Sequence, residues 1–266
     1  MEWTRLVPVA LTGLGVVLAS ATAVWALSLR KRDASIADVA WGPGFVLLAA
    51  TWTLLTDGHG PRRALVLALV TLWGLRLAFH IAARNRGKGE DPRYRRFRER
   101  AGGSFPVRSL ASVFWLQAVL MWIVAAPLLP ALAADRPDRL TPLDGLGALI
   151  WLTGFLFEAV GDAQLRRFKA DPANQGKVLD GGLWRYTRHP NYFGDATLWW
   201  GLWCFAAAVP GGVITAFGPL LMTYLLLRVS GVRMLEADLR KRKPEYREYV
   251  ERTNAFFPGP RRRRPV

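Results

Sequence analysis

The sequence is poor in the residues that most often hold metals or form covalent cross-links. Its 266 residues include one cysteine, Cys204, and three histidines, His59, His80 and His189. A single cysteine excludes an internal disulfide and gives no indication of the redox compartment. Three histidines are too few for the His-rich di-iron site of membrane desaturases and hydroxylases, and no His/Cys pair has the spacing of a zinc site. We therefore predict no metal centre.

Acidic residues are scarce relative to basic ones, and a glycine signature for nucleotide binding is missing. There are 20 Asp and Glu against 36 Lys and Arg, for a formal net charge of +16. In a soluble chain this charge would suggest nucleic-acid binding. Here the cations lie between apolar runs, so membrane topology explains them and we expect no nucleic-acid partner. The pairs Gly13-x-Gly15 and Gly145-x-Gly147 lack a third glycine and follow no strand, so they do not predict a Rossmann-type site.

Apolar sequence, in contrast, is abundant. Hydrophobic residues make up 52% of the chain, which also contains 12 Trp. Runs of about 20 apolar residues, the length needed to cross a bilayer, recur along it. We predict an all-α, polytopic membrane protein that forms one membrane domain over 1–266 and has about seven transmembrane helices. The expected segments are 6–28, 36–56, 64–83, 110–132, 143–165, 192–209 and 212–229.

The connections between these segments alternate between rich and poor in Lys and Arg. Nine of these residues lie from Arg84 to Arg108 and six from Arg166 to Arg188, whereas the last two segments have none between them. The positive-inside rule then predicts an outside N-terminus and a cytosolic C-terminus. We expect a multi-pass protein of the cell (inner) membrane. Its basic end, 258–266, is predicted to be disordered and to favour anionic lipid headgroups.

Eight ionisable or amide side chains inside the apolar segments fall in the predicted cytosolic half. Such groups are costly in a bilayer and usually face a cavity or a partner. Single members have simpler explanations, such as snorkelling for Arg228, a buried ion pair for Arg76 or a helix-dipole contact for Asp195. Their shared depth favours one polar cavity that opens to the cytosol. The group consists of Asp38, Arg76, His80, Gln117, Glu158, Asp162, Asp195 and Arg228.

A cationic loop leads into the sixth apolar segment. Arg185, Arg188 and His189 precede a helix start whose free N–H groups favour an anion, and Arg166 and Lys169 end the segment before it. Positive-inside signalling accounts for some of these cations. The functional hypothesis is a cofactor that carries a diphosphate. The residues expected to hydrogen-bond its ribose or amide groups are Glu158, Asp162, Asn174 and Asn191.

Four stretches resemble the bacterial DUF1295 group of the steroid 5-alpha-reductase-like membrane superfamily. They are SIADVAWGPGF at 35–45, the stretch 75–94, the stretch 158–203 and the closing YVERTNAFFP at 249–258. The resemblance implies a seven-helix membrane reductase whose cofactor-binding core covers 110–257. Such an enzyme binds NADPH from the cytosol and reduces a carbon–carbon double bond conjugated to a carbonyl in a steroid-like or isoprenoid lipid.

The resemblance also implies roles for individual residues. The steroid enzymes polarise the ketone with a Glu on the second helix and a Tyr on the third. The nearest groups in this chain are Asp38 and His80, which we predict as the catalytic, proton-donating residues. The loop and the resemblance together give an expected cofactor-binding set of Glu158, Asp162, Arg166, Lys169, Asn174, Arg185, Tyr186, Arg188, His189, Asn191, Tyr192 and Asp195.

The sequence is also compatible with two functions other than a reductase. The RHPNYFG core and the tail residues Leu235, Glu236, Tyr246 and Tyr249 also look like those of isoprenylcysteine and phospholipid methyltransferases, which use S-adenosylmethionine. A non-catalytic lipid-binding or scaffold protein is the other. The basic, amide-rich stretch 162–177 favours the reductase, because a methyl donor needs no diphosphate site. No feature of the sequence indicates the oligomeric state.

Overall fold

The computed structural model describes residues 3–229, 232, 236 and 245–262. These residues form helices, turns and loops, with no strand among them, which confirms the all-α prediction. Residues 258–262 of the predicted basic tail have no regular secondary structure, whereas its residues 263–266 lie outside the described part.

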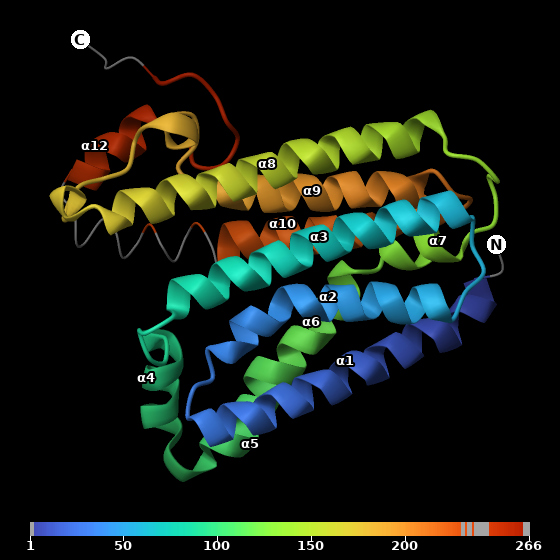
Figure 1. The fold of residues 1–266 in the computed structure, drawn as a ribbon, viewed down its shortest axis with the longest axis horizontal. Coiled ribbons are helices and arrows are strands. Elements are labelled where there is room, and N and C mark those ends of the chain that lie inside the picture. Colours follow the sequence, from blue (N-terminus) through green and yellow to red (C-terminus); the bar gives the residue numbers. More distant parts are fainter. Residues whose placement is uncertain (1–2, 230–231, 233–235, 237–244, 263–266) are drawn as a thin grey trace. The chain divides into compact units, whose positions relative to one another are not determined.

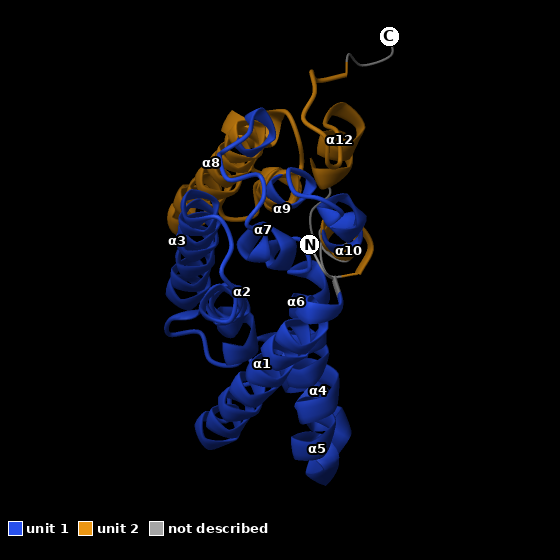
Figure 2. Ribbon diagram, turned by 90° about the vertical axis from the view of Figure 1, so that its right-hand side faces the viewer, with its two compact units in different colours: residues 1–144, 205–218 blue, residues 145–204, 219–266 orange. Residues whose placement is uncertain are grey.

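The chain divides into two compact units, coloured separately in Figure 2. Unit 1 consists of residues 1–144 and 205–218, and unit 2 consists of residues 145–204 and 219–266. The predicted cofactor-binding core, 110–257, takes residues from both units, and its role remains a prediction.

Unit 1 is built on three long helices, α1 (Trp3–Lys31), α2 (Ile36–Leu54) and α3 (Gly60–Asn85). Helix α2 packs against both α1 and α3, which flank it in Figure 1, and buries Phe45 and Leu48 completely. The shorter elements of the unit are α4 (Pro92–Ala101), η1 (Gly102–Ser104), α5 (Phe105–Ser109), η2 (Leu110–Trp115), α6 (Leu116–Val124), α7 (Leu128–Ala133) and η5 (Gly212–Ala216).

A fully buried ion pair in unit 1 connects the start of α3 to Asp144. Arg62, in the first turn of α3, donates from Nε to Oδ1 of Asp144 at 2.8 Å and from Nη2 to Oδ2 at 2.9 Å. Its guanidinium also donates to the carbonyls of Pro137 and Arg139 at 3.2 and 2.9 Å. The side chains of Arg62 and Asp144 are 0% and 1% exposed. A bidentate pair with its remaining donors satisfied is the arrangement in which a buried charge is tolerated.

Unit 2 contains most of α8 (Pro142–Ala170) and α9 (Pro190–Ala207). Its other elements are η3 (Pro172–Asn174), η4 (Gly182–Arg185), most of α10 (Phe217–Tyr224), η6 (Leu225–Val229) and α12 (Glu245–Arg252).

Helices α8 and α9 approach each other closely at glycines. A Cβ atom on Gly154 would lie 2.5 Å from the carbonyl oxygen of Gly194, and one on Gly194 would lie 2.4 Å from the backbone nitrogen of Glu158. Further along, a Cβ on Gly201 would lie 2.5 Å from the backbone nitrogen of Trp151. Only glycine fits at these distances. Small residues of this kind let membrane helices gain dispersion contacts between their backbones.

The predicted apolar segments are all helical, but their lengths and continuity differ from expectation. Within the described residues, five helical stretches are long and apolar enough to cross a bilayer, which supports a multi-pass membrane protein. Helices α2 and α9 are not among the five, because Trp, Gly and Pro dilute their apolar character and α9 also carries Asn191 and Asp195. The count of seven and the direction of the termini remain predictions. The five stretches are Thr4–Lys31, Gly60–Asn85, Pro92–Val124, Pro142–Ala170 and Gly212–Val229.

The predicted segment 110–132 is not one helix. Its residues 110–124 belong to a helical stretch that begins at Pro92 and ends at Val124, and a turn at 125–127 separates this stretch from α7. Pro127 ends this turn, and a proline lacks the N–H needed to continue the preceding helix.

The glycine contacts between α8 and α9 lead to a test. Gly194→Val should lower the stability by about 1–3 kcal/mol, because the added atoms overlap the backbone of Glu158. The measurement is thermal unfolding of the purified full chain in detergent. Gly145→Val is the matched control, since a Cβ there meets no atom within 4 Å. Equal unfolding temperatures for the two variants would contradict the close packing.

Candidate functional site

The α8–α9 contact brings four of the expected cofactor residues together in unit 2. Asn191, in the first turn of α9, donates from Nδ2 to Oδ1 of Asp162 on α8 at 3.1 Å. Glu158 lies against Gly194, the neighbour of Asp195. Glu158, Asp162 and Asp195 are buried at 3%, 6% and 9% exposure. The structure therefore joins Asp162 and Asn191 across the two helices and buries Glu158 and Asp195 near this contact.

A second cluster follows directly in the RHPNY stretch. Arg188 donates from Nε to Oε1 of Glu236 at 2.8 Å, and Nε2 of His189 lies 3.2 Å from the same oxygen. The His189 ring stacks on Tyr192, with centroids 5.5 Å apart and planes 6° from parallel. Burial raises the pKa of Glu236, but the hydrogen bonds from His189 and Arg188 outweigh burial and lower that pKa to about 2. Glu236 is thus an ionised carboxylate that contacts both the Arg188 guanidinium and the His189 ring, and it was not in the predicted set.

Arg188 also binds the last turn of α12 and the residues that follow it. Its Nη1 donates to the carbonyl of Val250 at 3.0 Å and to that of Thr253, while its backbone N–H donates to the carbonyl of Asn254 at 2.9 Å. The side chain is only 8% exposed. In this structure the Arg188 guanidinium is buried and binds a carboxylate and two backbone carbonyls of the protein itself. The sequence had suggested a cation accessible to an anionic ligand.

Two contacts with α8 fix the loop that carries Arg185 and Tyr186. The Trp184 indole donates to the carbonyl of Gly161 at 3.1 Å, and the N–H of Leu183 donates to Oε1 of Gln164 at 3.0 Å. On the other side of the loop, the Tyr249 hydroxyl donates to the carbonyl of Trp184. The loop is therefore held between the last third of α8 and α12.

The remaining expected cofactor residues of unit 2 lie around this loop. Arg166, Lys169 and Arg185 are exposed, and Tyr186 is 47% exposed. The Asn174 side chain donates to the carbonyl of Phe168 at 3.2 Å and to Oδ2 of Asp171 at 3.3 Å, so it folds back on the end of α8. The exposed cations are the groups in this region that can meet phosphates from solution.

Asp38, in unit 1, has a partner that the sequence analysis missed. The Tyr94 hydroxyl donates to Oδ1 of Asp38 at 2.6 Å, and Nη2 of Arg93 donates to Oδ2 at 2.8 Å. Nε2 of Gln117 in turn donates to the Tyr94 hydroxyl at 3.4 Å. His80, the other predicted catalytic residue, is half-buried on α3. Asp38 therefore belongs to a chain of hydrogen bonds formed with α4 and α6.

A sequence signal for Tyr94 existed. Asp91 and Pro92 form an N-cap and first-turn proline, and the Asp91 side chain does accept from the N–H of Arg93 at 2.8 Å. A helix start at that point predicts that Tyr94 lies on its first turn. Its contact with Asp38, 56 residues earlier, depends on tertiary structure.

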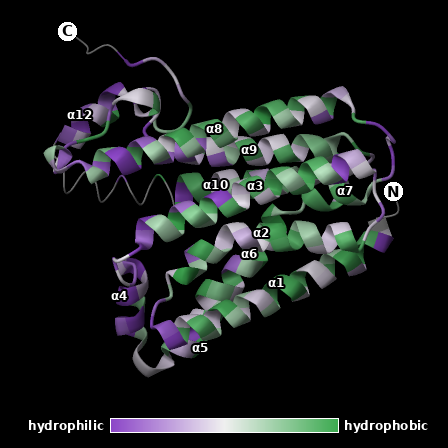
Figure 3. Ribbon diagram, viewed as in Figure 1, coloured by the Kyte–Doolittle hydropathy of each residue, from purple (hydrophilic) through white to green (hydrophobic). Residues whose placement is uncertain are grey.

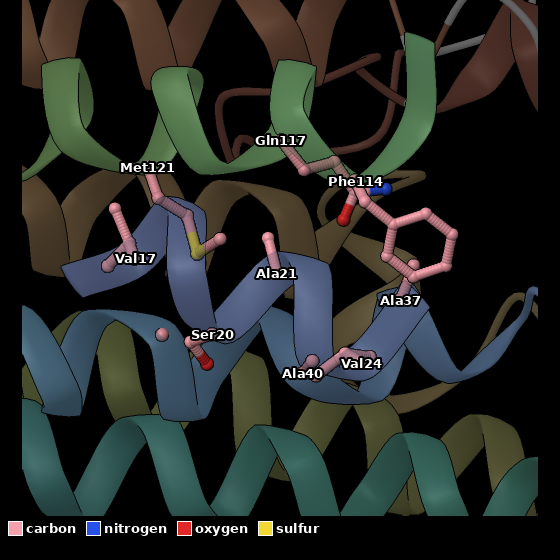
Figure 4. A pocket seen from close by; sticks show the side chains of 10 residues that line it. Val17, Ser20, Ala21, Val24, Ala37, Ala40, Phe114, Gln117 and Met121 are labelled. Atoms are coloured by element: carbon pink, nitrogen blue, oxygen red, sulfur yellow. The ribbon is translucent and has the colours of Figure 1, made fainter. Parts of the chain in front are cut away.

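Gln117 also lines a cavity in unit 1, shown in Figure 4. The wall consists mainly of small apolar side chains such as Ala21, Ala37 and Ala40, and Ser20 is its other polar side chain. The accessible volume of this cavity is about 20 Å³, roughly the space of one water molecule. The Asp38–Tyr94–Gln117 chain thus leads from a carboxylate to the wall of a largely apolar cavity.

The ionised state of Glu236 makes the stability depend on pH. Its folded pKa of about 2 lies below the ordinary value of 4.5, so its contribution is present above pH 4.5 and is lost as the pH falls toward 2. Glu236→Gln should therefore destabilise the protein at pH 7 by on the order of 3 kcal/mol, and the difference from the unchanged protein should shrink below pH 4. Thermal unfolding across this pH range provides the measurement.

Glu248→Gln is the matched control for that experiment. Glu248 forms an exposed ion pair with Arg252 on α12 at 3.3 Å, and exposed pairs contribute little. A Glu236→Gln protein as stable at pH 7 as the control would show that the cluster does not support the fold.

The sequence is similar to those of a protein family and of known proteins. The family model described as "Protein of unknown function (DUF1295)" matches residues 24–253. An uncharacterised protein of Schizosaccharomyces pombe (strain 972) is 24% identical over 262 residues, which cover 88% of this chain and 75% of that protein. A probable O-methyltransferase of Ustilaginoidea virens is 33% identical over 73 residues, or 27% of this chain and 26% of that protein. No solved structure matches the chain.

The family match spans the elements that carry both hydrogen-bonded clusters of unit 2 and the Asp38–Tyr94–Gln117 chain of unit 1. From this match, we conclude that the chain belongs to the DUF1295 family.

Proposed function

We propose that this protein is an integral membrane reductase that uses NADPH to reduce a carbon–carbon double bond conjugated to a carbonyl in a lipid. The observation that carries the proposal is the Asp38–Tyr94 pair, joined at 2.6 Å and linked through Gln117 to an apolar cavity. An acid beside a phenol is a proton-donating arrangement, which this reaction needs. Membership in the DUF1295 family and the resemblance to steroid reductases add support.

The residues of unit 2 have the chemistry that NADPH requires. Arg166, Lys169 and Arg185 are exposed cations suited to its phosphates. Asp162, held by Asn191, offers a carboxylate that can accept from ribose hydroxyls. Glu158, Asn174, Tyr186, His189, Tyr192 and Asp195 complete the proposed cofactor residues, with Arg188 bracing the loop that carries them.

NADPH, when bound, supplies a hydride to the double bond. Reduction of a conjugated carbonyl leaves negative charge on the carbonyl oxygen until a proton arrives. The Tyr94 hydroxyl, positioned by Asp38, which pairs with Arg93, can turn from Asp38 and donate its proton to that oxygen, and a proton from water then restores the hydroxyl. A donor held in place beforehand in a low-dielectric site stabilises such charge strongly. His80 remains a second candidate donor.

The substrate in this proposal is a lipid that enters from the bilayer. The cavity beside Gln117 is walled mainly by alanine, valine, phenylalanine and methionine side chains, and it lies in a unit whose helices are apolar enough to span a membrane. Such walls suit a hydrocarbon skeleton with one hydrogen-bond acceptor, as in a steroid-like or isoprenoid enone. Because the accessible volume in this structure is about 20 Å³, the proposal requires the helices around the cavity to move apart when the lipid binds.

A second candidate function is methyl transfer from S-adenosylmethionine. The similarity to a probable O-methyltransferase over 73 residues is the observation that favours it. A methyl donor needs no cations for phosphates and no proton donor for an enolate. Calorimetry of the purified protein with NADPH and with S-adenosylmethionine separates the two candidates, because each predicts binding of one ligand alone.

The proton-donating role of Tyr94 can be tested by kinetics. Oxidation of NADPH is followed against a panel of lipid enones with the full chain in detergent. Tyr94→Phe and Asp38→Asn should each lower kcat by about 10²-fold or more, because they remove the proton donor or the carboxylate that positions it, while NADPH binding stays unchanged. Tyr224→Phe, at a tyrosine 57% exposed on α10, is the control. An unchanged kcat in Tyr94→Phe would remove Tyr94 from the reaction.

The cofactor assignment has its own test. Arg166→Gln and Asn191→Ala should each raise the Kd for NADPH about tenfold. Arg166→Gln removes a charge-assisted hydrogen bond to a phosphate, and Asn191→Ala removes the hydrogen bond that positions Asp162. Arg167→Gln is the control, since Arg167 is exposed on the same turn of α8 but lies outside the proposed set. NADPH binding of equal strength in all three variants would rule out this site.

A further inference from the structure

We infer that the exposed face of α4, together with the end of α3, is a binding surface for the phosphate groups of anionic phospholipids. We call this face the α4 surface. It lies entirely in unit 1, and it neither requires nor affects the proposed reductase activity.

Acidic and basic side chains lie on different sides of α4. The acidic groups of this region that face inward are paired, Asp38 with Arg93 at 2.8 Å and Glu90 with Arg98 at 2.7 Å. The outer face is left almost entirely cationic, with Glu99 as its exposed acid. The exposed cations of the α4 surface are Arg84, Arg86, Lys88, Arg95, Arg96 and Arg100.

The α4 surface is held in place by contacts with the turn between α1 and α2. The N–H of Ala34 donates to Oε1 of Glu90 at 2.8 Å, and the N–H of Asp91 donates to Oγ of Ser35 at 2.7 Å. The Arg98 guanidinium lies 3.9 Å from the ring centroid of Phe105. A topology signal needs only the charge of a loop. These contacts instead fix a folded helix, so its arginines keep a defined spacing.

The position of the α4 surface along the chain favours lipid headgroups as its ligand. It begins where the apolar span Gly60–Asn85 ends and continues into the start of Pro92–Val124. Figure 3 shows the change from the hydrophobic α3 to the hydrophilic α4. Beside the cations, Val107 is 75% exposed. Cations clustered at the end of a membrane helix, with apolar side chains next to them, match a surface of anionic lipid, and guanidinium groups suit phosphate oxygens.

The test measures lipid binding to the purified full chain in a non-ionic detergent. Phosphatidylglycerol, phosphatidylcholine and soluble glycerol 3-phosphate are titrated separately, and bound molecules are counted by native mass spectrometry. We expect saturable binding of phosphatidylglycerol that weakens in 0.5 M salt and no comparable binding of phosphatidylcholine. The variant Arg95→Gln/Arg96→Gln/Arg100→Gln should bind phosphatidylglycerol about tenfold or more weakly.

The matched control removes three exposed cations elsewhere in unit 1, as Arg5→Gln/Arg136→Gln/Arg139→Gln. It should bind phosphatidylglycerol as the unchanged protein does. Unfolding temperatures in detergent without added lipid verify that both triple variants are folded. Equal losses in the two variants would show that only net charge matters and would overturn the α4 surface as a site. Saturation by glycerol 3-phosphate at the same concentrations would overturn the assignment to lipid.

Discussion

The close contact of α8 and α9 is the constraint on which the candidate cofactor region depends. Helices meet this closely only where neither carries a side chain, and Gly154 and Gly194 provide such a point. Their contact sets how the two helices are aligned, and that alignment places Asp162 opposite Asn191 and Glu158 beside Gly194. Within a medium of low dielectric, a buried carboxylate needs such partners, so the packing of backbones and the satisfaction of polar groups act together.

Buried arginines show the same need for partners. Arg62 forms a bidentate pair with Asp144, and Arg188 binds Glu236 and two carbonyls. Pairs of this kind contribute little net stability compared with apolar substitutes, but losing one partner is costly. The arginines of the chain thus divide by surroundings. Some brace helices internally, while those of the α4 surface remain exposed and available to ligands.

The two halves of the proposed chemistry could be predicted from the sequence to different degrees. The stretch 158–195 contains residues close enough in sequence to be grouped by pattern, and the structure brings Asp162 and Asn191 into contact. The partner of Asp38 could not be predicted this way. The family resemblance suggested His80 as the second donor, whereas the structure shows that the Tyr94 hydroxyl donates to Asp38. Glu236 was likewise missed as a partner of Arg188, because 48 residues separate them.

By itself, the sequence determined the helical class, the positions of the apolar segments, the excess of cations in particular connections and the family resemblance. All of these depend on local composition, periodicity or motifs, which are readable along the chain. Tertiary structure decided which charges meet. It turned Arg188 inward onto Glu236, joined Tyr94 to Asp38 and faced the remaining arginines of α4 outward. These outcomes depend on contacts between residues far apart in sequence, and the requirement that a buried charge find a partner does not specify which partner it finds.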